Sequence, residues 1–254
     1  MNKIINKNTT LEEYPKIYQK KINGVTTLYL KNSLKDEINH VTFIFFQIGK
    51  KSDLKNILYS KIFESCIGNK FFDELRTVRQ LGYIVKNYIE YLDDVIYFNI
   101  LVQGSKKLPE DVEEDINSII KEIFEKINCN NFIDIKNNLK FELMKIENNL
   151  LERTNKIFKK VELHEDFIEE DNLIYELSNI NSFDAIKSFF KNIMIDNPKR
   201  INIYYYGKGI SDEELSNKFK NISKQYSLNN NINITYTNDI NIFQNNENIM
   251  YINN

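Results

Sequence analysis

The sequence has few of the residues that mark specialised chains. Its 254 residues include only two cysteines, three prolines, seven glycines and no tryptophan. Two isolated cysteines give no clustered pair for a metal site or a redox motif. No run approaches the roughly 18 to 20 apolar residues that cross a bilayer, and the first 20 residues hold no signal-like apolar run. We therefore expect no membrane partner and a reducing, cytoplasmic location.

Histidine is equally scarce, with only His40 and His164. A zinc hydrolase helix of the H-x-x-E-H type carries two imidazoles on one face beside a carboxylate that works as general base. The residues three and four positions after His164 are Phe167 and Ile168, so this spacing is not met. We predict no metal site in this chain and interpret His164 as a residue on a helix surface.

Other catalytic motifs are also missing. The chain has no phosphate-binding glycine loop and no G-x-S-x-G nucleophile turn. Cys66 falls on the apolar face of a predicted helix, so we interpret it as a small core residue rather than a nucleophile. The acidic run at 110–115 fits a solvated helix beginning as well as a metal site.

The charge balance excludes one class of partner. Lys and Arg number 34 against 36 Asp and Glu, which gives a formal charge of -2. No overall positive field attracts a phosphate backbone, so we expect no nucleic acid partner. Hydrophobic residues form 42% of the chain and aromatic residues 13%, enough for a substantial core.

The hydrophobic periodicity predicts one α+β domain over residues 1–254, with a leader of about 20 residues and an asparagine-rich tail at about 229–254. Alternating β-branched and aromatic residues predict strands at 25–30, 40–48 and 200–207 and a hairpin after Gly82. Apolar residues at helical spacing predict helices from Asp53, from Pro109, from Phe132 through Leu150, and near 157–166, 170–178 and 182–194. Most of the predicted strands lie in the first half of the chain and one follows the helices. This order favours an antiparallel sheet packed against several helices.

One stretch stands out, "ELRTVRQLGY" at 74–83, where a helical pattern stops and a strand pattern begins. Arg76 and Tyr83 then lie at opposite ends of a short connection near a sheet edge. Arg76 could pair with a local acid while Tyr83 packs with its hydroxyl in water. Alternatively, both side chains could donate hydrogen bonds into a cleft, to a peptide carbonyl or a developing oxyanion. The residues alone favour the structural interpretation.

The longer stretch "FFDELRTVRQLGYIV" resembles a segment in the C-terminal, non-catalytic half of the insulysin and pitrilysin family of zinc metallopeptidases, the insulinase family. The family pattern L-R-T-x-x-Q-L-G-Y-x-V is matched in register by Leu75, Arg76, Thr77, Gln80, Leu81, Gly82, Tyr83 and Val85. The elements on either side follow the family's order and spacing, so the resemblance covers nearly all of residues 20–210.

The resemblance implies an α+β metallohydrolase-like fold of the LuxS and mitochondrial processing peptidase type, similar to the fourth of the family's four homologous domains. It implies that a catalytic N-terminal half, in cis or in trans, carries the zinc and cleaves peptides. Arg76 and Tyr83 would hold the substrate backbone and stabilise the tetrahedral intermediate. This chain lacks the zinc motif and is expected to be inactive alone. The alternative is a free-standing, inactive homologue that acts as a binding or assembly subunit.

Overall fold

The computed structural model describes residues 19–20, 22, 24–31, 36–92, 94–145, 149–162, 170–208, 211, 213–214, 217, 236–237 and 251–252. His164 and most of the asparagine-rich tail lie outside these residues, so the interpretation of His164 as a surface residue stays a prediction. No helix in the described part of the chain is long and apolar enough to cross a membrane.

A six-stranded sheet forms the centre of the fold, in the order β4-β5-β3-β6-β2-β7. The strands are β2 (Val25–Lys31), β3 (His40–Lys50), β4 (Ile84–Leu92), β5 (Val95–Gly104), β6 (Arg200–Tyr206) and β7 (Tyr236–Thr237). The β4, β5, β3 and β6 neighbours are antiparallel, whereas β2 pairs in parallel with β6 and with β7. A separate two-stranded pair joins β1 (Gln19–Lys20) and β8 (Tyr251–Ile252). The sequence did not reveal the parallel pairs.

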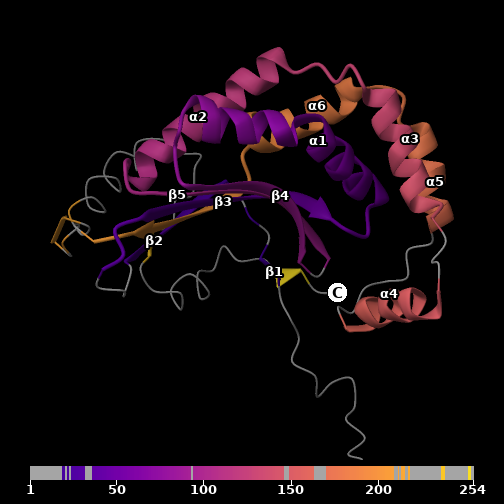
Figure 1. The fold of residues 1–254 in the computed structure, drawn as a ribbon, viewed down its shortest axis with the longest axis horizontal. Coiled ribbons are helices and arrows are strands. Elements are labelled where there is room, and N and C mark those ends of the chain that lie inside the picture. The colour runs from indigo at the N-terminus through magenta and orange to yellow at the C-terminus, as the bar shows by residue number, and fades with distance from the viewer. Residues whose placement is uncertain are drawn as a thin grey trace, which may run out of the picture.

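Three of the helices that the structure describes pack on one face of this sheet (Figure 1). The described helices are α1 (Leu54–Asp73), α2 (Pro109–Lys126), α3 (Phe132–Leu143), α4 (Leu150–Glu162), α5 (Glu170–Asn179) and α6 (Phe183–Lys191). In Figure 1, α1, α2 and α6 lie over the sheet, α3 and α5 lie beside one end of it, and α4 lies apart. Two π-helical segments, η2 (Glu74–Val78) and η3 (Asn192–Asp196), extend α1 and α6. The α+β prediction is confirmed.

The core lies between the helices and the sheet, because α1 and α2 both direct their apolar side chains towards the same face of the sheet. Phe63 on α1 stacks on Phe190 of α6 with ring centroids 3.7 Å apart, and it also contacts Phe98 of β5. All three rings are fully buried. This packing fixes α1, and with it the end of α1 from which the 74–83 stretch departs.

The single helix predicted from Phe132 through Leu150 is wrong. In the structure α3 ends at Leu143, and Leu150 begins a different helix with its side chain 80% exposed. Ile135 and Leu139 are buried as predicted. The apolar spacing continued through both helices, so the periodicity alone could not separate them.

Cys66, interpreted from the sequence as a small core residue, is partly buried against the core and is also bonded to a second cysteine. Cys66 of α1 and Cys129, in the connection after α2, form a disulfide with their Cα atoms 5.7 Å apart. The two cysteines are separated by 63 positions in the sequence, so no local pattern indicated the contact; only the packing of α1 against this connection brings the two thiols together. The bridge ties α1 to the loop between α2 and α3.

Candidate functional site

The 74–83 stretch forms a π-helical turn followed by a short connection into edge strand β4. The Arg79 amide donates to the Glu74 carbonyl over 3.0 Å, a wider turn than in an α-helix. The Leu81 amide then donates to the Leu75 carbonyl, also over 3.0 Å. Gln80 takes a positive φ of 49°, which reverses the chain direction. Single π turns within helices are frequent at functional sites.

Two leucines anchor this turn from below. Leu75 is fully buried and Leu81 is 2% exposed, and both belong to the main core cluster. Burying a leucine side chain stabilises a fold by roughly 1.5–3 kcal/mol. The motif's leucines are therefore structural, and they hold the residues between them at the surface.

Gly82 lets the chain pass very close to β5. A Cβ at Gly82 would stand 2.4 Å from the Gln103 carbonyl oxygen, and a Cβ at Gly104 would stand 3.0 Å from the Gly82 Cα. The next amide, of Tyr83, donates to the same Gln103 carbonyl over 2.7 Å. The two glycines thus allow the close contact that sets the backbone position of Tyr83.

Arg76 and Tyr83 meet above this support. The Arg76 guanidinium lies 5.6 Å from the centroid of the Tyr83 ring, within the range of a cation–π contact. Tyr83 is 79% exposed, and Arg76 is exposed as well. Within the described residues neither side chain makes a hydrogen bond or an ion pair. The donors of both side chains face solvent.

The ion pair that the structural interpretation expected of Arg76 is made by Arg79 instead. Its Nη1 lies 3.5 Å from Asp115 Oδ1, and its Nη2 forms a short ion pair with Glu122. Hydrogen bonds from Ser118 and Arg79 hold the pKa of the Glu122 carboxyl below its usual value. Arg79 therefore fastens the turn to α2. The signal in the sequence was the helical spacing of Asp115, Ser118 and Glu122.

Of the three remaining motif residues, two lie at the surface and one is buried. Thr77 and Gln80 are exposed. Val85 is 5% exposed and begins the buried face of β4. The structure indicates no chemical role for Thr77. Gln80 contributes the positive φ at which the chain reverses.

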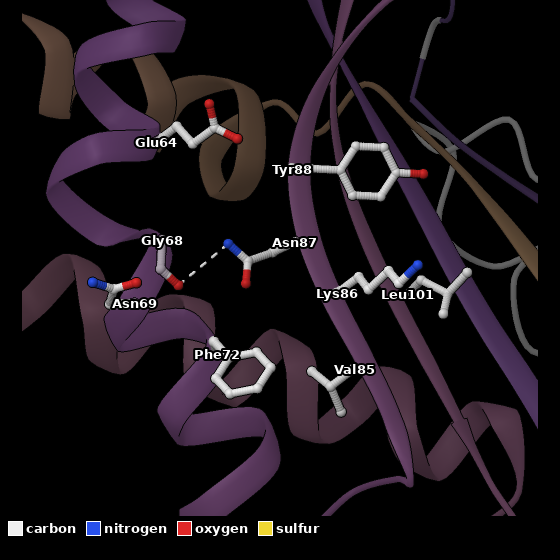
Figure 2. A pocket seen from close by; sticks show the side chains of 9 residues that line it. All are labelled: Glu64, Gly68, Asn69, Phe72, Val85, Lys86, Asn87, Tyr88 and Leu101. Atoms are coloured by element: carbon white, nitrogen blue, oxygen red, sulfur yellow. Dashed lines mark hydrogen bonds between the residues drawn. The ribbon is translucent and has the colours of Figure 1, made fainter.

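A pocket of about 750 Å³ lies next to the turn, between the second half of α1 and β4. It is lined by Glu64, Gly68, Asn69, Phe72, Val85, Lys86, Asn87, Tyr88 and Leu101, which Figure 2 shows from close by. The Asn87 side chain donates to the Gly68 carbonyl over 3.3 Å. Glu64 accepts from the Ile89 amide over 3.0 Å. Burial, with a smaller effect from the Glu64 charge, raises the pKa of nearby Tyr91 to about 12.

No group of three or more His, Cys, Asp or Glu side chains that could hold a metal is found among the residues that the structure describes. His40 has a structural position, because its Nδ1 accepts from the Gly207 amide over 3.1 Å. The acidic run on α2 is likewise structural in part, since Asp115 pairs with Arg79 and with Lys107.

Comparisons with known proteins agree with this picture. Residues 62–158, which include the whole 74–83 stretch, match the family model "PQQ synthase PqqF-like, C-terminal lobe domain 4". No curated protein sequence matches the chain. Pitrilysin has a similar fold, with a TM-score of 0.63 and 13% identity over 93% of this chain and 24% of pitrilysin.

Two further solved structures share the fold. A protease from Helicobacter pylori aligns with a TM-score of 0.60 and 10% identity over 78% of this chain and 48% of its own. A peptidase M16 inactive domain from Pseudomonas fluorescens aligns with a TM-score of 0.52 and 10% identity over 78% and 47%. The chain thus spans about a quarter to a half of the length of these structures. The family model over residues 62–158 and the shared fold both agree with the resemblance to the C-terminal domains of insulinase/pitrilysin-like proteins.

Proposed function

We propose that the chain is the non-catalytic, substrate-binding domain of an insulysin/pitrilysin-like zinc metalloendopeptidase. A zinc-bearing N-terminal half, in cis or in trans, supplies the metal and the activated water. Arg76 and Tyr83 of this chain complete the active site by holding the peptide backbone. The chain alone cleaves nothing in this proposal.

The observation that carries the proposal is the pairing of Arg76 with Tyr83. Two exposed hydrogen-bond donors from opposite ends of the turn come together, with the ring centroid and guanidinium 5.6 Å apart. A guanidinium offers five N–H donors and a phenol offers one, which suits the carbonyl oxygens of a peptide. The same donors suit the negative oxygen that develops during peptide hydrolysis.

The support beneath the two side chains favours a working site over a chance surface contact. Leu75 and Leu81 are buried, Gly82 is held against Gln103, and Arg79 is paired with α2. Donors on a rigid support need little reorganisation when a charge develops, and this increases their effect on the transition state.

Peptide binding to the chain tests the proposal directly. A fluorescein-labelled ten-residue peptide of alternating valine and glutamate is titrated with the protein, and its anisotropy is followed. We expect Arg76→Ala to weaken binding about tenfold and Tyr83→Phe about two- to tenfold, the values for losing a charged and a neutral hydrogen bond. Arg153→Ala and Tyr175→Phe, at an exposed arginine and an exposed tyrosine on other helices, serve as matched controls.

Equal affinities for all four variants and the parent chain would contradict the proposal. They would favour the alternative of an inactive binding or assembly subunit that does not use the 74–83 turn.

A further inference from the structure

The pocket beside the 74–83 turn follows an open edge of the sheet. β4 is the first strand of the six-stranded sheet, and within the described part of the chain its backbone pairs only with β5. A strand at a sheet edge presents a row of unpaired N–H and C=O groups that can pair with another chain.

The hydrogen bond at Ile89 shows which groups face outwards. The Ile89 amide donates to the Glu64 side chain of α1 instead of to β5. In an antiparallel pair, alternate residues point their N–H and C=O groups to the same side. Val85 and Asn87, at intervals of two before Ile89, therefore also direct their backbone groups away from β5. The Glu64 side chain thus occupies the outer edge of β4 at Ile89. Nearer to Tyr83, no strand among the described residues pairs with the outward backbone groups of β4.

The lining of the pocket fits an added strand. Val85 and Asn87 lie towards Phe72 and Gly68 on α1, whereas Lys86 and Tyr88 lie on the other side of β4 with Leu101 (Figure 2). The pocket thus wraps round the edge and contacts both faces of β4. Side chains of an added strand alternate between two faces in the same way. Its volume of about 750 Å³ is within the usual range of ligand sites, about 300–1,000 Å³.

We propose that the outer edge of β4 at Val85 and Asn87 binds the backbone of an extended peptide as an added strand, next to the part of that peptide held by Arg76 and Tyr83. This inference rests on the proposed function, because the occupant is the substrate peptide. Val85 is two residues from Tyr83, or about 7 Å along a strand, so one extended peptide reaches both places.

The chemistry of the pocket favours this occupant over a second copy of the chain. Lys86 is exposed on the edge strand, and an edge lysine disfavours pairing between identical chains. The same lysine attracts a carboxylate on one face of a peptide, while Phe72 and Val85 offer apolar contacts on the other. A peptide that alternates apolar and acidic residues matches both faces.

N-methylation of the probe peptide tests the backbone pairing without altering the protein. Two versions of the labelled valine–glutamate peptide carry N-methyl groups on all valines or on all glutamates. Only one of these sets has its amides turned towards β4 in a paired strand. We expect one version to bind at least tenfold more weakly than the parent peptide and the other to bind within threefold. Equal effects of the two versions would overturn the inference.

A change in the protein gives a second, independent measurement. Asn87→Pro removes an amide that points outwards, a position where an edge strand tolerates proline. We expect at least a tenfold loss of affinity for the parent peptide, with folding checked by thermal unfolding. Should this variant fail to fold, the N-methylated peptides still decide the question.

The outcomes separate the two proposals. If Arg76→Ala weakens binding but the two N-methylated peptides behave alike, the edge inference fails and the proposed function stands. If the parent peptide does not bind at all, both fail. A dimer held through β4, detected by sedimentation and broken by Asn87→Pro, would assign the edge to a second copy and would also overturn the inference.

Discussion

Gly82 lies so close to Gln103 that a Cβ on the glycine would stand 2.4 Å from the Gln103 carbonyl oxygen. The contact involves backbone atoms, which cannot rotate away as a flexible side chain could. The structure thus links the position of Tyr83, one residue further on, to the absence of a side chain at Gly82.

Gly82→Ala is therefore expected to lower the free energy of unfolding by about 1–3 kcal/mol, the usual cost of forcing an extra group into a packed site. Gly68→Ala is a matched control, because its Cβ would meet only the Asn87 side chain at an ordinary 3.6 Å. Gly68 lies inside α1, where alanine is favoured over glycine by about 0.5–1 kcal/mol. Urea unfolding of both variants checks the prediction, and equal effects would contradict it.

The partly buried acid Glu113 gives a second prediction. It forms a short ion pair with Arg200 and accepts hydrogen bonds from Asn202 and Tyr204 of β6. The Arg200 side chain is only 8% exposed, so Glu113→Ala leaves a buried positive charge without its carboxylate. We expect a loss of about 3–5 kcal/mol in the free energy of unfolding.

Glu114→Ala is the control for that experiment, since the neighbouring side chain is exposed and its loss should change the stability by less than about 0.5 kcal/mol. A similar small effect for Glu113→Ala would show that the Glu113 network does not stabilise the fold.

The disulfide between Cys66 and Cys129 gives a third prediction. The double variant Cys66→Ser, Cys129→Ser should be less stable than the oxidised parent by about 2–4 kcal/mol, because the open chain gains conformational freedom when unfolded. Thermal unfolding with and without a reductant provides the check. The reductant should lower the Tm of the parent and leave that of the double variant unchanged.

If the parent shows two free thiols and no response to the reductant, the disulfide does not form in solution. A reducing compartment such as the cytoplasm would itself keep these cysteines in the reduced thiol form. The thiol count therefore also bears on the cytoplasmic location that the sequence favoured.

The pKa of Glu122 gives a fourth prediction. Ser118 and Arg79 lower the folded pKa of this carboxyl. A depressed folded pKa contributes stability that is present above the unfolded pKa and is lost as the pH falls through the folded value. In Arg79→Ala the Glu122 pKa should rise towards its ordinary value, as measured by an NMR titration of the carboxyl carbon. An unchanged pKa would contradict the ion pair.

Local patterns predicted much of this fold. The helical stripe of α2 was unambiguous, because it places apolar residues on one face that the structure buries. The β-branched and aromatic residues of β5 predicted a strand, and the structure buries both of its faces from Val95 to Ile100. The parallel pairing of β2 with β6 and the Cys66–Cys129 bridge join residues far apart in the sequence. Such contacts depend on how the elements pack together, and no local period records them.

The candidate site was predicted in part. The motif located Arg76 and Tyr83, and the helix-to-strand change placed them at two ends of one connection. The residues could not show that Arg79, and not Arg76, makes the ion pair, since both arginines follow the same helix. The sequence also could not show which backbone groups of β4 point away from β5. That depends on the register of β4 with β5 and on the hydrogen bond from the Ile89 amide to Glu64.

The most direct test of the account is the turnover of Tyr83→Phe in an enzyme completed by a zinc-bearing half. The variant keeps the ring and its contact with Arg76 but loses one donor. We predict that kcat for peptide cleavage falls by about 10² or more, the usual effect of removing one donor to a developing oxyanion. Arg76→Ala should also raise KM, because in the proposed function the guanidinium binds the substrate in the ground state as well. A kcat for Tyr83→Phe within twofold of the parent would contradict the account.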